Sequence, residues 1–356
     1  MSLPELEVMV GQMIVMDLRG TVLPEEMRKL LQAGLISGFL LFPGKDVSPE
    51  QIRKLTDAVR ENSREYPAMI AIDQEGGRVL RLKAPFTQVP AMRRLGAKID
   101  EKLAFEVGKI FGSELRAVGI NTDFAPVVDL DLNPENQVIG DRSLGPGPET
   151  VAKLGAAIID GLHSEKVVAC AKHFPGHGAS KEDSHLELPK LAADQKTIRE
   201  RELVPFRRAI EAGVETVMVG HVLYPAFDKY HPATLSERII TQLLREEMRF
   251  DGVVIVDSLE MKALEGIPLA DRAFMAVRAG ADIMLICDGI ESARRIHMAI
   301  CQAVTMGVLP METIYNAFQR IMKLKDRLLK QSDLPDLDSI NKIVGSEPHR
   351  KITVSF

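Results

Sequence analysis

Short apolar runs alternate with longer amphipathic segments along the whole chain. The runs are rich in Val, Ile, Leu and Met, and their hydrophobicity is continuous rather than alternating. Continuous hydrophobicity is typical of parallel strands that are covered on both faces of the sheet. We therefore expect about eight strands, the number that a closed (β/α)8 barrel needs. The runs cover residues 11–18, 37–44, 68–73, 122–130, 167–174, 216–222, 252–259 and 282–289.

Amphipathic segments between these runs predict helices. Residues 24–34, 49–62 and 102–119 have apolar positions at helical spacing, and several such segments end at Gly where the next run begins. The repeat predicts an α/β fold, a single (β/α)8 TIM-type barrel, with an open doubly wound sheet as the structural alternative. We expect residues 1–332 to form the barrel domain and residues 333–356 to form a short C-terminal tail, packed on the barrel or trailing from it.

Composition narrows the class of protein. The 356 residues include 45 Lys and Arg against 50 Asp and Glu, which gives a formal net charge of −5. This charge argues against an overall basic nucleic-acid-binding protein, so we expect no nucleic acid partner. Hydrophobic residues at 46% and charged residues at 27% are ordinary globular values, which argue against a disordered chain or a coiled coil.

The chain shows no membrane or export signal. No apolar run approaches the roughly 20 residues that a membrane-spanning helix needs. The first residues include Glu5 and Glu7 and lack the basic start and apolar stretch of a secretory signal. Cys170, Cys287 and Cys301 lie in or beside apolar runs and are too few for a disulfide framework. We therefore predict a cytoplasmic protein with no membrane partner.

Polar residues directly follow five of the apolar runs. In a barrel these positions are the carboxyl ends of the strands, where active sites lie. A single Asp or His at such a place is usually a cap or a turn residue, but five at the same topological position indicate a site. The positions are residues 73–78 after the third run, Asp129, Lys172 with His173, His221 and Asp257.

The densest group of polar residues lies in the Gly-rich segment 171–189. Its three His residues suggest a metal site, but no HxH or HExxH pair is present, so we expect no metal. Asp183 and His185 are two residues apart, so their side chains would project to the same side of an extended loop. A carboxylate beside His185 would orient the imidazole and stabilise its cationic form, as a general acid/base requires.

Asp257 places a carboxylate at the end of a buried run. Burial of a carboxylate is costly unless it is paired or hydrogen-bonded, which indicates a nucleophile or an electrostatic stabiliser. A retaining glycosidase needs one carboxylate below the anomeric carbon and one proton donor beside the leaving oxygen. Asp257 and His185 could fill these two roles.

Six motifs in this order resemble glycoside hydrolase family 3, and specifically its NagZ-type β-N-acetylhexosaminidases. KHFPGHG followed by DSH is the most specific element, because it separates the hexosaminidases from the β-glucosidases of the family. The motifs are IDQEGGRVLRL, INTDFAPVVDL, NQVIGDRSLG, KHFPGHG with DSH, MVGHVLYPAFD with PATLS, and FDGVVIVDSLEM. One departure is Val256, because this family usually has Ser before the nucleophile.

The resemblance implies retaining, exo-acting hydrolysis of terminal β-linked N-acetylglucosamine from an oligosaccharide or small molecule, without a cofactor. It implies that Asp257 is the nucleophile, that His185 is the acid/base and that Asp183 is the partner of His185. It also implies substrate-binding roles for Asp73, Arg81, Arg142, Lys172 and His173, and site lining by His221.

Several alternatives remain open at this point. They are a β-N-acetylglucosaminide phosphorylase, a broader-specificity family 3 β-glycosidase, substrate-assisted catalysis, a metal-dependent hydrolase and a non-catalytic sugar-binding barrel. The natural substrate could be a cell-wall muropeptide, a chitin oligomer or a glycoconjugate. Aromatic residues at 5% and the absence of Trp argue against a long polysaccharide groove. A cytoplasmic location favours the muropeptide and peptidoglycan recycling.

Overall fold

Eight parallel strands close into a barrel, as the sequence predicts. The structure is a computed structural model that describes residues 4–180, 187–329 and 333–356. The barrel closes where the first strand pairs with the last, with Ile14 beside Met284. Around the barrel the order of the strands is β1 (Ile14–Arg19), β10 (Ile283–Ile286), β9 (Val253–Val256), β8 (Thr216–Val219), β7 (Val168–Phe174), β6 (Thr122–Asp123), β3 (Met69–Ile72) and β2 (Gly38–Phe42).

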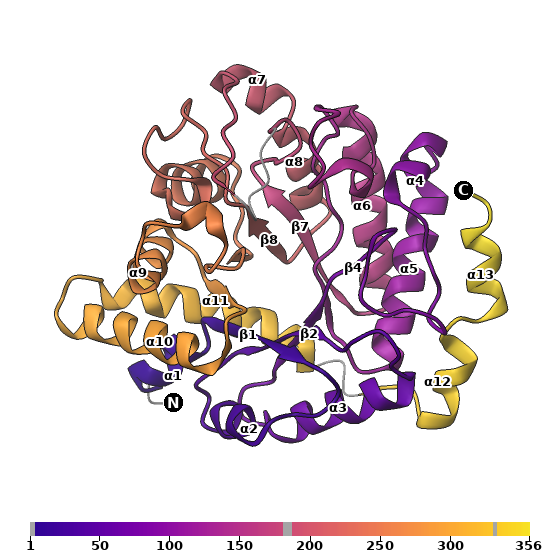
Figure 1. Ribbon diagram of the computed structural model, residues 1–356, viewed down its shortest axis with the longest axis horizontal. Coiled ribbons are helices and arrows are strands. Elements are labelled where there is room, and N and C mark those ends of the chain that lie inside the picture. Colours follow the sequence, from indigo (N-terminus) through magenta and orange to yellow (C-terminus); the bar gives the residue numbers. More distant parts are fainter. Residues whose placement is uncertain (1–3, 181–186, 330–332) are drawn as a thin grey trace.

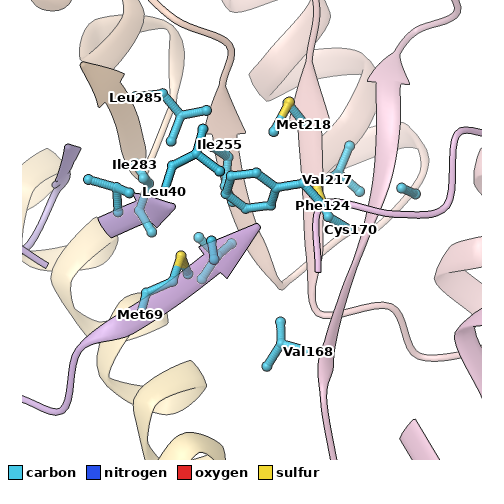
Figure 2. Packing of buried hydrophobic residues seen from close by; sticks show 14 of the residues in the cluster. Leu40, Met69, Phe124, Val168, Cys170, Val217, Met218, Ile255, Ile283 and Leu285 are labelled. Carbon is cyan, nitrogen blue, oxygen red and sulfur yellow. The ribbon is translucent and has the colours of Figure 1, made fainter. Parts of the chain in front are cut away.

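The interior of the barrel is filled with apolar side chains. Figure 2 shows Phe124 surrounded by residues that come from different strands, including Met218, Ile255 and Leu285. All of these side chains are buried. The strands β2 and β3 approach so closely that a Cβ atom on Gly38 would lie 1.9 Å from the Met69 carbonyl oxygen. The barrel interior is therefore a packed core and not a pore. In such barrels a binding site lies at an end of the barrel.

Helices surround the barrel strands (Figure 1). They include all three of the helices whose bounds the sequence predicts, and each predicted end lies within two residues of the observed one. The α-helices are α1 (Leu6–Gly11), α2 (Glu25–Gln32), α3 (Pro49–Glu61), α4 (Met92–Lys98), α5 (Glu101–Ala117), α6 (Pro148–Ser164), α7 (Gln195–Glu200), α8 (Leu203–Glu211), α9 (Leu269–Ala279), α10 (Gly289–Thr305), α11 (Met311–Leu329), α12 (Leu337–Ile343) and α13 (Glu347–Thr353). A π-helix (Arg238–Glu247) and the short 3-10 helices Gly140–Arg142, Ala233–Leu235 and Lys262–Leu264 complete the helical segments.

Helix starts follow from local capping. The Ser48 hydroxyl accepts the Gln51 N–H at 3.3 Å, and the Gln51 side chain accepts the Ser48 N–H at 2.9 Å, so α3 begins with a capping box. Asp100 caps α5 by accepting the N–H groups of Lys102 and Leu103. These contacts satisfy N–H groups that lack partners within the helix, and they fix where each helix starts.

Two segments differ from the prediction. The fourth apolar run has only two residues of regular strand, Thr122 and Asp123. Its chain still follows β7, since Cys170 N–H donates to the Ala125 carbonyl and Val128 N–H to the Lys172 carbonyl, both at 2.9 Å. The polar segment after β3 forms an unpredicted hairpin, β4 (Gln74–Gly76) and β5 (Val79–Leu80).

The C-terminal helices α12 and α13 lie against α5, and α12 also contacts α3 (Figure 1). The buried Glu114 carboxylate of α5 accepts the Gly345 N–H and pairs with His349, both at 2.9 Å. The same carboxylate accepts the N–H and the hydroxyl of Thr87. Glu114 therefore links the C-terminal segment to the loop that follows β5.

Among the helices within residues 4–180, 187–329 and 333–356, none is long and apolar enough to cross a membrane.

Candidate active site

A cavity of about 470 Å³ lies at the carboxyl ends of the barrel strands. This volume is within the range of about 300–1,000 Å³ that is usual for small-molecule sites. Part of its lining is the last apolar layer of the barrel interior, which includes Leu40, Phe124, Met218 and Leu285 (Figure 2). Its charged and titratable lining residues are Asp73, Glu75, Arg78, Arg81, Arg142, Lys172, His173, His177 and Asp257.

Lys172 lies at the centre of a buried ionic network. Its ammonium is 2.8 Å from Asp73 Oδ1 and 2.6 Å from Glu75 Oε1. Arg142 donates two hydrogen bonds to the Glu75 carboxylate, at 2.7 and 2.8 Å, and Arg81 approaches Asp73 at 3.3 Å. The network joins the ends of β3 and β7 with the loop of Arg142, so it fixes these side chains before any ligand binds.

Glu75 and Lys172 are each held in the charged form by their partners. Burial by itself would raise the pKa of Glu75, but Lys172 and Arg142 hold that pKa far below its usual value. Burial would lower the pKa of Lys172, but Asp73 and Glu75 raise it above its usual value. Fixed charges of both signs can donate and accept hydrogen bonds, which suits a ligand with many hydroxyl groups.

A second group organises the loop that follows β7. The buried Asp129 carboxylate accepts the N–H and Nδ1–H of His173, at 3.1 and 2.7 Å, and the N–H of His177 at 2.6 Å. Burial would raise the pKa of Asp129, but His173 and His177 lower it. The bond at Nδ1 leaves the other ring nitrogen of His173, Nε2, facing the cavity residue Arg142 at 3.5 Å. Asp129 therefore orients an imidazole at the wall of the cavity.

Asp257 follows β9 directly and lines the cavity. Its N–H donates to the Val219 carbonyl at 3.1 Å, and one of its carboxylate oxygens accepts the Ser258 N–H at 2.8 Å. Burial by itself would raise the pKa of Asp257, but the positive potential of His221 and His173 and the Ser258 N–H hold it below its usual value. An ionised carboxylate thus faces a cavity rich in hydrogen-bonding groups.

The structure brings together six of the residues that the sequence indicates. Asp73, Arg81, Arg142, Lys172, His173 and Asp257 all line this one cavity. His221 is fully buried behind it, between Thr234 at 2.9 Å and the Ser258 carbonyl at 2.8 Å. Its position is therefore under the turn that carries Asp257. Asp183 and His185 lie outside the described residues.

Three acidic residues near the site had no predicted role, although Glu75 and Asp129 lie at strand ends that the sequence indicates as a site, whereas Asp123 was not singled out. Glu75 and Asp129 are the hydrogen-bond acceptors described above. Asp123, at the end of β6, is fully buried and accepts the Gln74 N–H at 3.0 Å, and burial raises its pKa well above the usual value. The signal for Glu75 and Asp129 was their place at the end of an apolar run, which indicates a strand end but not which donor each carboxylate meets, whereas Asp123 lies inside a run and gave no such signal.

Among the described residues, no three His, Cys, Asp or Glu side chains gather where they could hold a metal ion.

The fold and the site define a barrel whose cavity, at the carboxyl ends of the strands, is lined by carboxylates and cations, as in barrel enzymes. The glycosyl hydrolase family 3 N-terminal domain matches residues 5–324 of this sequence. The chain belongs to this family, and it is a glycoside hydrolase.

Individual relatives agree with this assignment. A β-hexosaminidase of Nitrosomonas eutropha is 39% identical over 287 residues, which cover 79% of this chain and 82% of the relative. A family 3 β-N-acetylglucosaminidase structure from Paenibacillus has a TM-score of 0.94 and 38% identity, and the match covers 99% of this chain and 68% of that one. A β-glucoside phosphorylase structure, BglX, has a TM-score of 0.88 and 25% identity, covering 99% of this chain and 64% of that one.

Proposed function

We propose that this enzyme is a retaining, exo-acting β-N-acetylhexosaminidase that releases terminal β-linked N-acetylglucosamine. The observation that carries the proposal is the ionised carboxylate of Asp257, which follows a buried strand and faces a cavity lined by Asp73, Arg142 and Lys172. The names of the similar hexosaminidases support the choice of an N-acetylated sugar.

In the proposed reaction, Asp257 attacks the anomeric carbon of the sugar. The bond to the leaving oxygen breaks, its electron pair stays on that oxygen, and His185 protonates it. Water then gives a proton to His185 and attacks the same carbon, which releases Asp257 and retains the anomeric configuration. The roles of His185 and Asp183 are proposed from the DSH motif alone, because the structure does not describe residues 181–186.

The charged network is proposed to hold the sugar. Asp73, Arg81 and Lys172 meet at one wall of the cavity, and Arg142 and His173 meet beside them. Hydroxyl groups of a sugar can donate to the carboxylate and accept from the cations, so this wall can fix the orientation of the ring. His221 contributes from beneath, through the turn that carries Asp257.

Release of nitrophenol from the β-N-acetylglucosaminide and from the β-glucoside, measured side by side, tests this function. We expect selective cleavage of the N-acetylated substrate. The variant Asp257→Asn keeps the shape of the side chain but removes the nucleophilic charge, so kcat should fall about 10³-fold or more. Equal cleavage of both substrates, or activity that survives the substitution, would refute the proposal.

Phosphorolysis is a second candidate, favoured by the likeness to a β-glucoside phosphorylase structure. In that reaction phosphate replaces water in the second step, and the product is the sugar 1-phosphate. The cations Arg81, Arg142 and Lys172 at the cavity would tolerate an anionic acceptor. We expect the hydrolysis rate to be the same in phosphate-free buffer and in phosphate buffer, with free sugar as product. A rate that requires phosphate would favour the phosphorylase.

The natural substrate is proposed to be a cytoplasmic cell-wall muropeptide, which would place the enzyme in peptidoglycan recycling. The absence of Trp, which sugar-binding grooves use for stacking, supports a short substrate over a long polysaccharide. We also propose that residues 1–332 form the catalytic domain and that the tail, residues 333–356, supports it. The bonds of Gly345 and His349 with Glu114 favour this division of roles.

A further inference from the structure

The turn after β9, residues 257–261, is held from several directions. Its first residue, Asp257, bonds to β8 through its N–H, and Leu259 N–H donates to the Leu285 carbonyl of β10 at 3.2 Å. His221 meets the Ser258 carbonyl at 2.8 Å from below. The backbone of the turn is therefore tied to both neighbouring strands. One side chain of the turn, Glu260, adds a further tie that the proposed mechanism does not use.

Glu260 connects the turn to the end of β10. Its Oε2 accepts the Ser258 hydroxyl at 2.7 Å and the Cys287 N–H at 3.2 Å. Cys287 directly follows β10, so a single carboxylate oxygen joins two adjacent strand ends. Ser258 in turn donates its backbone N–H to Asp257 Oδ1 at 2.8 Å. A continuous chain of hydrogen bonds thus runs from the end of β10 through Glu260 and Ser258 to the nucleophile.

The surroundings of Glu260 indicate a structural bond rather than contact with substrate. Glu260 does not line the cavity that Asp257 lines. Its other oxygen, Oε1, is buried and has no hydrogen-bond partner among the described residues. Burial raises the pKa of Glu260, and the nearby Asp288 raises it further, although Ser258 and Cys287 act in the opposite direction. Since a single oxygen accepts both hydrogen bonds, we expect Gln, which keeps one acceptor oxygen, to replace Glu260.

We propose that Glu260 is a positioning residue for the nucleophile, which it holds in place by bonding Ser258 to the end of β10. This inference rests on the proposed role of Asp257. A nucleophile must meet the anomeric carbon at a defined distance and direction, and a displacement of about 1 Å can cost about 100-fold in rate. Ground-state binding of the sugar depends on other residues, so the effect belongs in kcat rather than in KM.

The test compares Glu260→Ala, Glu260→Gln and a matched surface control, Glu265→Ala, because Glu265 is exposed and lies near the same turn. The readouts are kcat and KM on the nitrophenyl N-acetylglucosaminide and the rate at which a fluorinated N-acetylglucosaminyl fluoride labels Asp257. We expect Glu260→Ala to lower kcat and the labelling rate about 10- to 100-fold. KM should stay within about 3-fold, and Glu260→Gln should restore most of the rate.

Ser258 gives a second route if Glu260→Ala does not fold. Ser258→Ala removes the same bond from its donor side and should lower kcat to a similar extent, whereas Ser258→Thr keeps the hydroxyl and should retain activity. Wild-type kcat in Glu260→Ala and Ser258→Ala, or equal losses in Glu260→Ala and Glu260→Gln, would overturn the inference and leave the proposed function intact. Wild-type enzyme that neither cleaves the substrate nor becomes labelled on Asp257 would overturn both.

Discussion

Glu75 is a carboxylate of the site that two cations share. It is buried, and its carboxylate is the shared partner of Arg142 and Lys172, at 2.6 to 2.8 Å. Removal of one member of a buried ion pair leaves an uncompensated charge and typically costs about 3–5 kcal/mol. We expect Glu75→Gln to lower the free energy of unfolding at pH 7 by about that amount, as measured by urea denaturation.

The pH dependence of this variant gives a second readout of the same interaction. The pKa of Glu75 is lowered in the folded protein, so in mildly acidic solution the unfolded chain binds a proton that the folded chain does not. The contribution of Glu75 is complete above the unfolded pKa of about 4.3 and is lost as the pH falls below it. The stability difference between wild type and Glu75→Gln should therefore shrink below about pH 4. The control is Glu149→Gln, because Glu149 is exposed. A stability difference between wild type and Glu75→Gln that stays constant with pH would contradict the role given to Glu75.

At the scale of elements, the strands could be predicted because their chemistry is local. Parallel barrel strands are covered on both faces, so each appears as a continuous apolar run whatever its neighbours are. The sequence does not reveal where a run stops pairing regularly, as after Asp123, because the partner strands decide which N–H groups are paired. The hairpin of β4 and β5 was missed because its turn depends on Gly76 and Gly77, whose φ angles of 100° and 57° become readable only in the structure.

The same division applies to the candidate site. Strand ends such as Asp73, Lys172 and Asp257 could be identified because a barrel brings all its carboxyl ends to one face. The pairing of these side chains could not be predicted, because it depends on distances between segments that are far apart in the chain, such as those of Glu75 and Arg142. The burial of His221 beneath the turn of Asp257 has the same cause. Position in the fold was therefore predictable from local pattern, whereas contact was not.

At the scale of the whole molecule, the amino end of the barrel is closed by a buried amine. Lys325 of α11 donates to the Gln12 side chain at 2.7 Å and to the Ser37 carbonyl at 3.0 Å. Gln12 in turn donates to the carbonyls of Gly34 and Ile36. These bonds tie a late helix of the barrel to the entry of its first two strands. Both acceptors of Lys325 are neutral, and burial lowers its pKa to about 7.

This pKa gives the stability of the whole barrel a defined pH dependence. An unfolded lysine has a pKa of about 10.4, so between about pH 7 and pH 10 the unfolded chain binds a proton that the folded chain has lost. Stability should therefore rise with pH in this window, by up to about 1.4 kcal/mol per pH unit from this group. Lys325→Met removes the amine that titrates. The free energy of unfolding of wild type, relative to that of the variant, should therefore increase with pH.

Urea denaturation at several values between pH 7 and pH 10 measures this growth. Lys323→Met makes the same chemical change two residues away on the same helix, at a side chain that is 75% exposed and pairs with Asp251. Its difference from wild type should not grow in this window, because an exposed side chain keeps its contact with water when the chain folds. Parallel stability curves for wild type and Lys325→Met would show that the buried amine keeps its proton, and that Gln12 and Ser37 stabilise the ammonium form.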